Sequence, residues 1–94
     1  MAQVVWTDRA LAQLDAIEIY ISQFNPRAAQ ETAAKLAAAG NSLSEQPDRG
    51  RPVGGRSREL TSVWPYIIRY HVDGARVVIL RIRHGARRPD RSPP

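Results

Sequence analysis

The sequence predicts an α+β domain in which a helical hairpin packs against an antiparallel sheet. Apolar residues recur at helical spacing in the first half of the 94-residue chain, and they alternate with polar residues in the second half. Asp73-Gly74 separates two alternating runs as a hairpin turn would. The expected order is strand, helix, helix, strand, strand, strand. We expect residues 1–94 to form one domain, with residues 89–94 as a frayed tail.

The first helix is predicted by an apolar stripe. A short strand at residues 4–6 precedes Thr7, which can cap the helix, and Asp8, which suits its positive end. The stripe is formed by Ala10, Leu14, Ile17, Ile21 and Phe24. Their spacing predicts a helix that runs to about Phe24.

The second helix carries a stripe of small side chains. Asn25 is a good N-cap, and Pro26 is favoured at the first helical position. The stripe comprises Ala29, Ala33, Leu36, Gly40 and Leu43. It predicts an antiparallel hairpin whose thin seam leaves room for another element to dock, although alanine chosen for helix propensity explains the composition equally well. Residues 47–57, rich in Gly, Pro and Arg, are predicted to form a loop.

The central hairpin is predicted to have one basic face. The first run places Tyr66, Ile68, Tyr70 and Val72 on one face and Ile67, Arg69 and His71 on the other. The second run places Val78, Leu80 and Ile82 on one face and Val77, Ile79, Arg81 and Arg83 on the other. Strict alternation therefore predicts that the two arginines share a face with Val77 and Ile79.

Charge is distributed unevenly along the chain. Residues 1–48 carry a net charge of −3 and residues 49–94 a net charge of +8, which together give the overall +5. Such an arginine-rich half suits nucleic acid, an acidic protein or a nucleoprotein complex, while a solubilising surface is the plainer interpretation. The chain has no cysteine and only two histidines, so we expect no metal or other cofactor. The absence of cysteine, of a signal sequence and of a long apolar run favours the cytoplasm, without membrane contact.

Several segments in order resemble the RelE/ParE toxin superfamily, nearer to its ParE, or plasmid-stabilisation, branch. They are VVWTDRALAQLDAIEIYI, FNPRAA, LSEQPDRGRP, RELTSVWPYIIRYHV and VVILRIRHGARR. The resemblance covers residues 4–89 and implies a RelE/ParE-like two-layer fold. It also implies a toxin of a type II toxin–antitoxin module, neutralised by a ParD-like antitoxin. Operator DNA would be bound only indirectly, through that antitoxin. ParE-branch toxins are associated with inhibition of DNA gyrase, and RelE-branch toxins with cutting messenger RNA on the ribosome.

The residues favour binding over catalysis. Metal-free RNA cleavage needs a base, an acid and cations for the transition-state phosphate. In RelE-like nucleases an arginine commonly follows the first tyrosine of the meander, whereas here Ile67 follows Tyr66. Lys35 is the only lysine, and no tyrosine follows His84. Gyrase inhibition is therefore the leading hypothesis, with a ribonuclease that uses His84, Arg81 and Arg83 as the runner-up and an inactive antitoxin-binding module as the third.

Two surfaces are predicted on these grounds. We expect the target to be bound by Arg81, Arg83, His84, Arg87 and Arg88 at the end of the last strand. We expect the antitoxin to be bound by Leu36, Leu43, Arg58 and Arg69. Arg58 and Arg69 have a plainer alternative, because either can pair with Glu59 instead.

Overall fold

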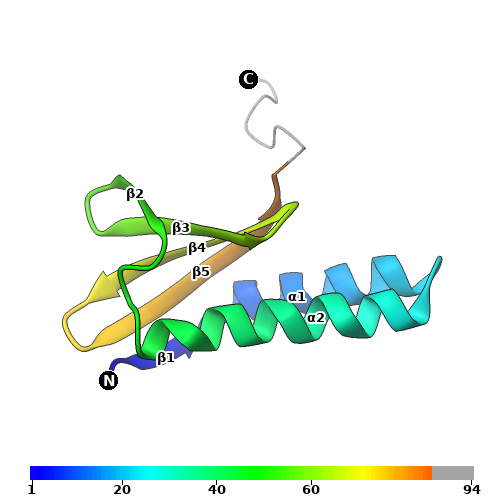
Figure 1. The fold of residues 1–94 in the computed structure, drawn as a ribbon, viewed down its shortest axis with the longest axis horizontal. Coiled ribbons are helices and arrows are strands. Elements are labelled where there is room, and N and C mark those ends of the chain that lie inside the picture. Colours follow the sequence, from blue (N-terminus) through cyan, green and yellow to red (C-terminus); the bar gives the residue numbers. More distant parts are fainter. Residues whose placement is uncertain (86–94) are drawn as a thin grey trace.

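The computed structural model describes residues 1–85, and it confirms the α+β fold class (Figure 1). The elements are β1 (Gln3–Trp6), α1 (Asp8–Ser22), α2 (Pro26–Asn41), the short 3-10 helix η1 (Ser42–Ser44), β2 (Arg51–Gly54), β3 (Ser57–Val63), β4 (Tyr66–Asp73) and β5 (Arg76–His84). The strands form one five-stranded sheet in the order β1-β5-β4-β3-β2. β1 joins β5 in parallel, and the other neighbouring pairs are antiparallel.

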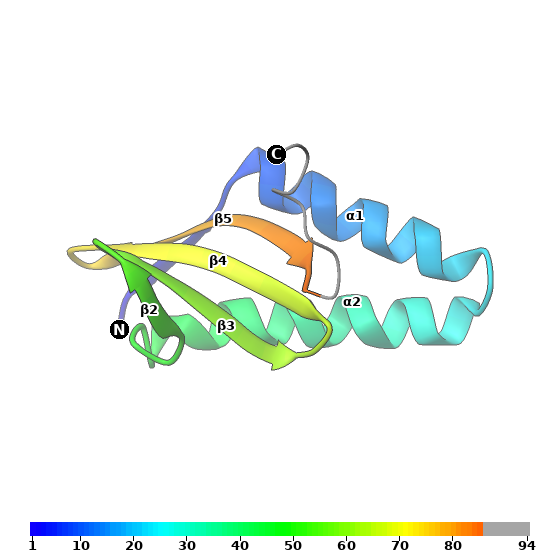
Figure 2. The same cartoon turned by 90° about the horizontal axis from the view of Figure 1, so that it is seen from above.

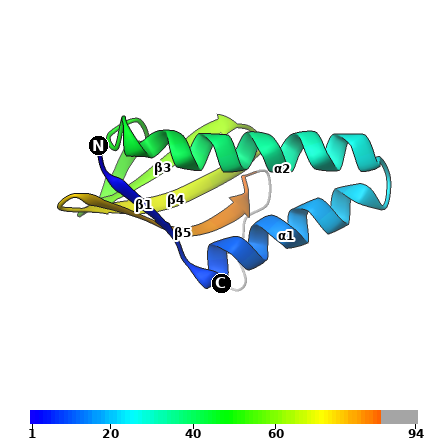
Figure 3. The ribbon, with the colours of Figure 1, turned by 90° about the horizontal axis from the view of Figure 1, so that it is seen from below.

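The two helices form an antiparallel hairpin beneath one face of the sheet, as Figures 1 and 3 show. Seen from above, both helices extend past the end of the sheet (Figure 2). No helix of residues 1–85 lies over the opposite face, which we call the open face. Within the described residues, no helix has the length and apolar character that crossing a membrane requires.

Both predicted helix caps are present. The Thr7 side chain accepts a hydrogen bond from the Ala10 amide, and the Asn25 side chain accepts one from the Ala28 amide. The first helix nevertheless ends at Ser22, two residues before the predicted Phe24, whose side chain is 73% exposed. The chain needs these residues to reach the extended backbone at Asn25 that starts α2, so Phe24 belongs to the turn and not to the apolar stripe.

The predicted loop at residues 47–57 contains a strand. β2 pairs with β3 through Arg51↔Glu59 and Pro52↔Arg58, with an irregularity between Pro52 and Gly54. Gly54 and Gly55 have φ values of 127° and 54°, which allow the chain to reverse tightly into β3. Proline and glycine argue against a central strand, but β2 is the outermost strand of the sheet, where both are tolerated.

A β-bulge changes the facing of the last strand. Tyr70 pairs with Ile79 while Arg69 pairs with Arg81, which leaves Leu80 as an additional residue in β5. Val77 and Ile79 therefore belong to the buried core together with Ile82, and the prediction that they share the arginine face was wrong. The predicted facing of β4 is confirmed, since Tyr66, Ile68, Tyr70 and Val72 all contribute to the core.

Gly40 allows Trp6 to cross the second helix closely. A Cβ atom at Gly40 would lie 2.4 Å from the Trp6 ring, whose Nε1 donates a 3.0 Å hydrogen bond to Asn41. Gly→Ala in a helix ordinarily stabilises by about 1 kcal/mol. We expect Gly40→Ala to destabilise the chain instead, by about 1–3 kcal/mol, because the indole must move. Thermal unfolding checks this, and an increased melting temperature would contradict the close packing.

Tyr70 fixes the segment that leads into β2. Its side chain is fully buried, and its hydroxyl donates to the Pro47 carbonyl and accepts from the Gly50 amide, both at 2.8 Å. Burial raises the pKa of the Tyr70 phenol, although the Gly50 amide and Arg58 oppose this effect. The hydroxyl therefore stays protonated and holds both backbone groups.

Replacing Tyr70 with phenylalanine should cost about 1–3 kcal/mol of unfolding free energy, because the Gly50 amide and Pro47 carbonyl lose their partner. Since the pKa of Tyr70 is raised in the folded state, its contribution is complete below the ordinary pKa of about 10 and is lost as the pH rises through the folded value. The free energy of unfolding, measured by denaturant melts from pH 8 to 11, should thus fall less steeply with pH for Tyr70→Phe than for the wild type. Parallel alkaline profiles would contradict this assignment.

Candidate functional site

Four charged residues form one row across the open face of the sheet. Arg51 of β2 pairs with Glu59 of β3, Glu59 with Arg69 of β4, and Arg69 with Arg81 of β5. Cross-strand partners project from the same face. The core residues Leu60 and Ile68, which neighbour the row along β3 and β4, alternate to the helix side. We call Arg51, Glu59, Arg69, Arg81 and Arg83 the arginine row, since Arg83 follows Arg81 on the same face.

Glu59 neutralises three arginines of the row. Its side chain is 3% exposed, and its carboxylate oxygens lie 3.2 Å from Arg51 Nη2, 3.2 Å from Arg83 Nη2 and 3.6 Å from Arg69 Nη1. A buried carboxylate is costly unless it is paired, and these contacts supply the pairing. From the sequence, Glu59 was considered only as an alternative partner for Arg58 or Arg69; its pairing with Arg69 is present, whereas its contacts with Arg51 and Arg83 were not predicted.

Arg81 lies at the end of the row, and no carboxylate among residues 1–85 forms an ion pair with it. It is half-buried and stands directly opposite Arg69, an arrangement of like charges that destabilises a sheet. Burial, followed by the nearby Arg69, Arg9 and Arg83, lowers the pKa of the Arg81 guanidinium, and Glu59 offsets this only in part. The group remains charged, because arginine does not deprotonate in proteins. The row therefore offers a partly desolvated cation to an incoming carboxylate or phosphate.

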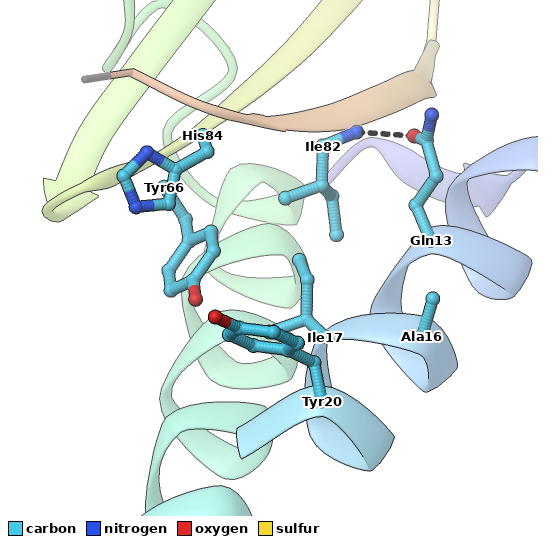
Figure 4. A pocket seen from close by; sticks show the side chains of 7 residues that line it. All are labelled: Gln13, Ala16, Ile17, Tyr20, Tyr66, Ile82 and His84. Atoms are coloured by element: carbon cyan, nitrogen blue, oxygen red, sulfur yellow. Dashed lines mark hydrogen bonds between the residues drawn. The ribbon is translucent and has the colours of Figure 1, made fainter. Parts of the chain in front are cut away.

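His84 lies on the other side of the sheet from the row. It pairs with Tyr66 across β4–β5, and the two rings meet edge to face at 5.4 Å. Figure 4 shows both rings at a cavity of about 420 Å³ beside α1. The cavity is lined by Gln13, Ala16, Ile17, Tyr20, Tyr66, Ile82 and His84. Of the residues expected to bind the target, Arg81 and Arg83 are thus brought together, whereas His84 is separated from them by the sheet.

The residues expected to bind the antitoxin are placed in three different settings. Leu36 of α2 and Leu43 of η1 are fully buried in the core between the helices and the sheet, and they offer no surface. Arg58 donates hydrogen bonds to the carbonyls of Asp48 and Gly50, so it braces the segment before β2. Arg69 belongs to the arginine row and keeps 31% of its side chain exposed.

Two further predicted residues, Arg87 and Arg88, lie outside the described residues, as does the tail predicted at residues 89–94. In the part of the chain that the structure describes, His, Asp and Glu side chains form no group of three that could hold a metal ion. The arginine row itself consists of guanidinium groups around the carboxylate of Glu59.

Comparison with known proteins finds similar sequences among toxins of type II toxin–antitoxin systems. A family model described as "ParE toxin of type II toxin-antitoxin system, parDE" matches residues 4–89. Toxin RelE2 of Caulobacter vibrioides is 58% identical over 87 residues, which is 93% of this chain and 99% of the relative. Toxin RelE1 of the same organism is 38% identical over 80 residues, or 82% of this chain and 86% of the relative.

A solved structure shares the architecture as well. The chromosomal ParDE toxin–antitoxin system from P. aeruginosa contains a chain that superposes with a TM-score of 0.81 at 29% sequence identity. The match covers 89% of this chain and 96% of that chain. The resemblance to RelE/ParE toxins drawn from the sequence is therefore confirmed.

Proposed function

Because this chain belongs to the ParE toxin family of type II toxin–antitoxin systems, we propose that it inhibits DNA gyrase by binding, without catalysis. We further propose that a ParD-like antitoxin neutralises it, because the matched structure is that of a ParDE toxin–antitoxin system. Sites on a shared fold differ among its members, so the choice of target depends on the residues of the site.

The observation that carries the proposal is the excess positive charge of the arginine row. Three arginines share the carboxylate of Glu59, and Arg81, the fourth arginine of the row, stands opposite Arg69. Such a surface complements an acidic groove or an enzyme bound to DNA. Guanidinium groups keep their charge when they are desolvated, which suits them to an interface.

The position of His84 supports binding over RNA cleavage. Cleavage without a metal needs a proton acceptor close to the cations that stabilise the phosphate. His84 is a candidate acceptor in the last strand, yet it faces the cavity with Tyr66 while Arg81 and Arg83 face the opposite side. The three residues that a ribonuclease would use, His84, Arg81 and Arg83, are therefore divided between the two faces of the sheet.

A gyrase assay tests the proposal directly. The purified toxin is added to gyrase, ATP and relaxed plasmid, and both supercoiling and double-strand cleavage are measured. We expect supercoiling to be inhibited, and we expect the cognate antitoxin to restore it. Full supercoiling at a large excess of folded toxin would refute gyrase as the target.

A ribosome-dependent ribonuclease is the second candidate, because two similar proteins bear the name Toxin RelE. The matching test incubates the toxin with translating ribosomes and maps the cleavage positions on the messenger RNA. Codon-positioned cuts that His84→Ala abolishes would establish this candidate in place of gyrase inhibition. Absence of any growth effect on induction, with antitoxin binding intact, would establish the inactive module instead.

A further inference from the structure

Ile67 is buried although it lies on the open face of the sheet. It alternates with the core residue Ile68, so its side chain projects away from the helices, yet it is only 5% exposed. The described helices all lie on the other side of the sheet, so a different part of the chain must cover Ile67. Because Ile67 is the second residue of β4, that cover comes from the nearby end of the sheet.

Trp64 supplies the cover from the turn between β3 and β4. Figure 2 shows this turn beside the end of β5, where the Gly85 amide donates a hydrogen bond to the Pro65 carbonyl at 2.6 Å. A Cβ atom at Gly85 would lie 2.9 Å from both Trp64 Cζ3 and Ile67 Cδ1. The indole and Ile67 therefore meet at Gly85, whose missing side chain leaves the space that the indole occupies.

The indole of Trp64 is held in place and is nevertheless exposed. Trp64 is 64% exposed, although its ring packs at Gly85 and covers Ile67. This packing sets the position of the ring before any partner binds, so binding costs little ordering of the side chain. Tryptophan and arginine are among the residues most enriched at positions that dominate the energy of protein interfaces.

Trp64 extends the arginine row. Ile67, which it covers, pairs with Arg83 across β4–β5. Arg81 follows on the same face, four residues or about 14 Å from Gly85 along β5. This side of the open face therefore presents an exposed indole at one end. At the other end it presents the one arginine of the row that forms no ion pair within residues 1–85.

We propose that Trp64 is a second anchor of the target-binding surface and packs against a large apolar side chain of the target protein. The same protein presents a carboxylate to Arg81, so one interface combines an apolar anchor with a charge pair. The inference rests on the proposed function, in which the target is gyrase, and it specifies the chemistry that gyrase must offer.

A protein suits this surface better than a single-stranded nucleic acid does. Successive bases stack on several aromatic side chains, spaced along a basic groove. On the open face of residues 1–85, Trp64 is the only exposed Trp, Tyr or Phe side chain, because exposed Tyr20 and Phe24 belong to the helical hairpin. One indole beside a row of arginines matches one apolar side chain beside an acidic residue.

Oxidative footprinting of the wild-type toxin tests the contact. Hydroxyl radicals label exposed aromatic rings, and mass spectrometry measures the label on each. In a mixture where gyrase supercoiling is inhibited, gyrase with plasmid should reduce labelling of Trp64 by at least about threefold. Phe24, which is 73% exposed in the turn between α1 and α2, is the internal control and should not change. Unchanged labelling of Trp64 would overturn the proposal, and so would equal protection by the plasmid alone, which would assign the indole to nucleic acid.

Substitution of Trp64 tests the anchor by its effect on inhibition. Trp64→Leu keeps an apolar cover over Ile67, so the melting temperature should stay within about 5 °C of the wild type. The toxin concentration that half-inhibits supercoiling should rise by roughly 30-fold, and Trp64→Phe, which keeps a ring, should recover most of this loss. Phe24→Leu is the matched control outside the row and should change inhibition by less than about threefold. Equal inhibition by Trp64→Leu and the wild type would overturn the proposal; footprinting decides it if Trp64→Leu does not fold.

Growth arrest separates this inference from the proposed target. If wild-type toxin leaves gyrase active, gyrase fails as the target, and induction of the same variants in cells then tests Trp64 for whichever protein is bound. At matched amounts of folded toxin, Trp64→Leu should arrest growth more weakly than the wild type and Phe24→Leu. Equal arrest by all three would overturn the inference, as would a wild-type toxin that leaves growth unaffected.

Discussion

Glu59→Ala is expected to lower the free energy of unfolding by about 2–4 kcal/mol. The change leaves Arg51, Arg69 and Arg83 without the carboxylate that all three contact within 3.6 Å. Arg51 keeps 65% of its side chain exposed, so water compensates for part of its loss. Arg83 keeps only 24% and should account for more of the cost.

Urea denaturation measures this effect, and salt identifies its origin. The destabilisation should shrink as sodium chloride rises, because repulsion among the remaining cations is screened. Glu45→Ala is the matched control. Glu45 is exposed directly after η1, so its substitution should change the free energy of unfolding by less than about 0.5 kcal/mol. A destabilisation by Glu59→Ala that does not change with salt would indicate lost packing instead of lost charge pairing.

Arg81→Ala is expected to weaken the proposed inhibition of gyrase by roughly tenfold or more while the fold stays intact. Within the described part of the chain, Arg81 is the arginine of the row that Glu59 does not contact, and it stands opposite Arg69. Its removal relieves repulsion with Arg69, so stability should remain within about 0.5 kcal/mol of the wild type or rise slightly. The gyrase supercoiling assay gives the inhibitory concentration, and a melting curve reports the fold.

The choice of Arg81 alone follows from the pairing of Arg83. Alternation along the strand suggests that Arg81 and Arg83 are equally dispensable for stability, but Arg83 is ion-paired with buried Glu59 and is not a free surface residue. A double substitution would therefore mix loss of binding with loss of stability. Arg76→Ala, which removes an exposed arginine at the start of the same strand, is the matched control. Equal inhibition by Arg81→Ala, Arg76→Ala and the wild type would place the gyrase-binding surface away from the row.

The parts of the fold that depend on nearby residues were predicted well. The caps at Thr7 and Asn25 formed as expected. The hairpin turn predicted at Asp73-Gly74 lies one residue later, because Asp73 still pairs with Arg76 and the loop is formed by Gly74, with a φ of 60°, and Ala75. Each signal needs only residues within a few positions of itself. The end of α1 was placed two residues too late, because Phe24 continues the apolar spacing although the turn already requires its backbone.

The candidate site was predicted only in part, because its geometry joins four strands. Arg69, Arg81 and Arg83 were predicted to bind a partner, whereas Glu59 at their centre was considered only as a possible ion-pair partner. Arg51 was assigned to a loop, since Pro52 and Gly54 resemble breakers until β2 is known to lie at the sheet edge. Leu36 and Leu43 were assigned to a partner surface, yet the sheet packs over them and buries both completely.

The two helices, the meander and the family follow from the amino-acid sequence, since periodicity, caps and ordered motifs are properties of neighbouring residues. Which side chains share a face with Arg81 depends instead on tertiary packing. The bulge at Leu80 lets Tyr70 and Ile79 meet in the core while Arg69 and Arg81 meet outside. A single additional residue in a strand reverses the facing of all that follow, and it is fixed by packing across strands that no local pattern contains.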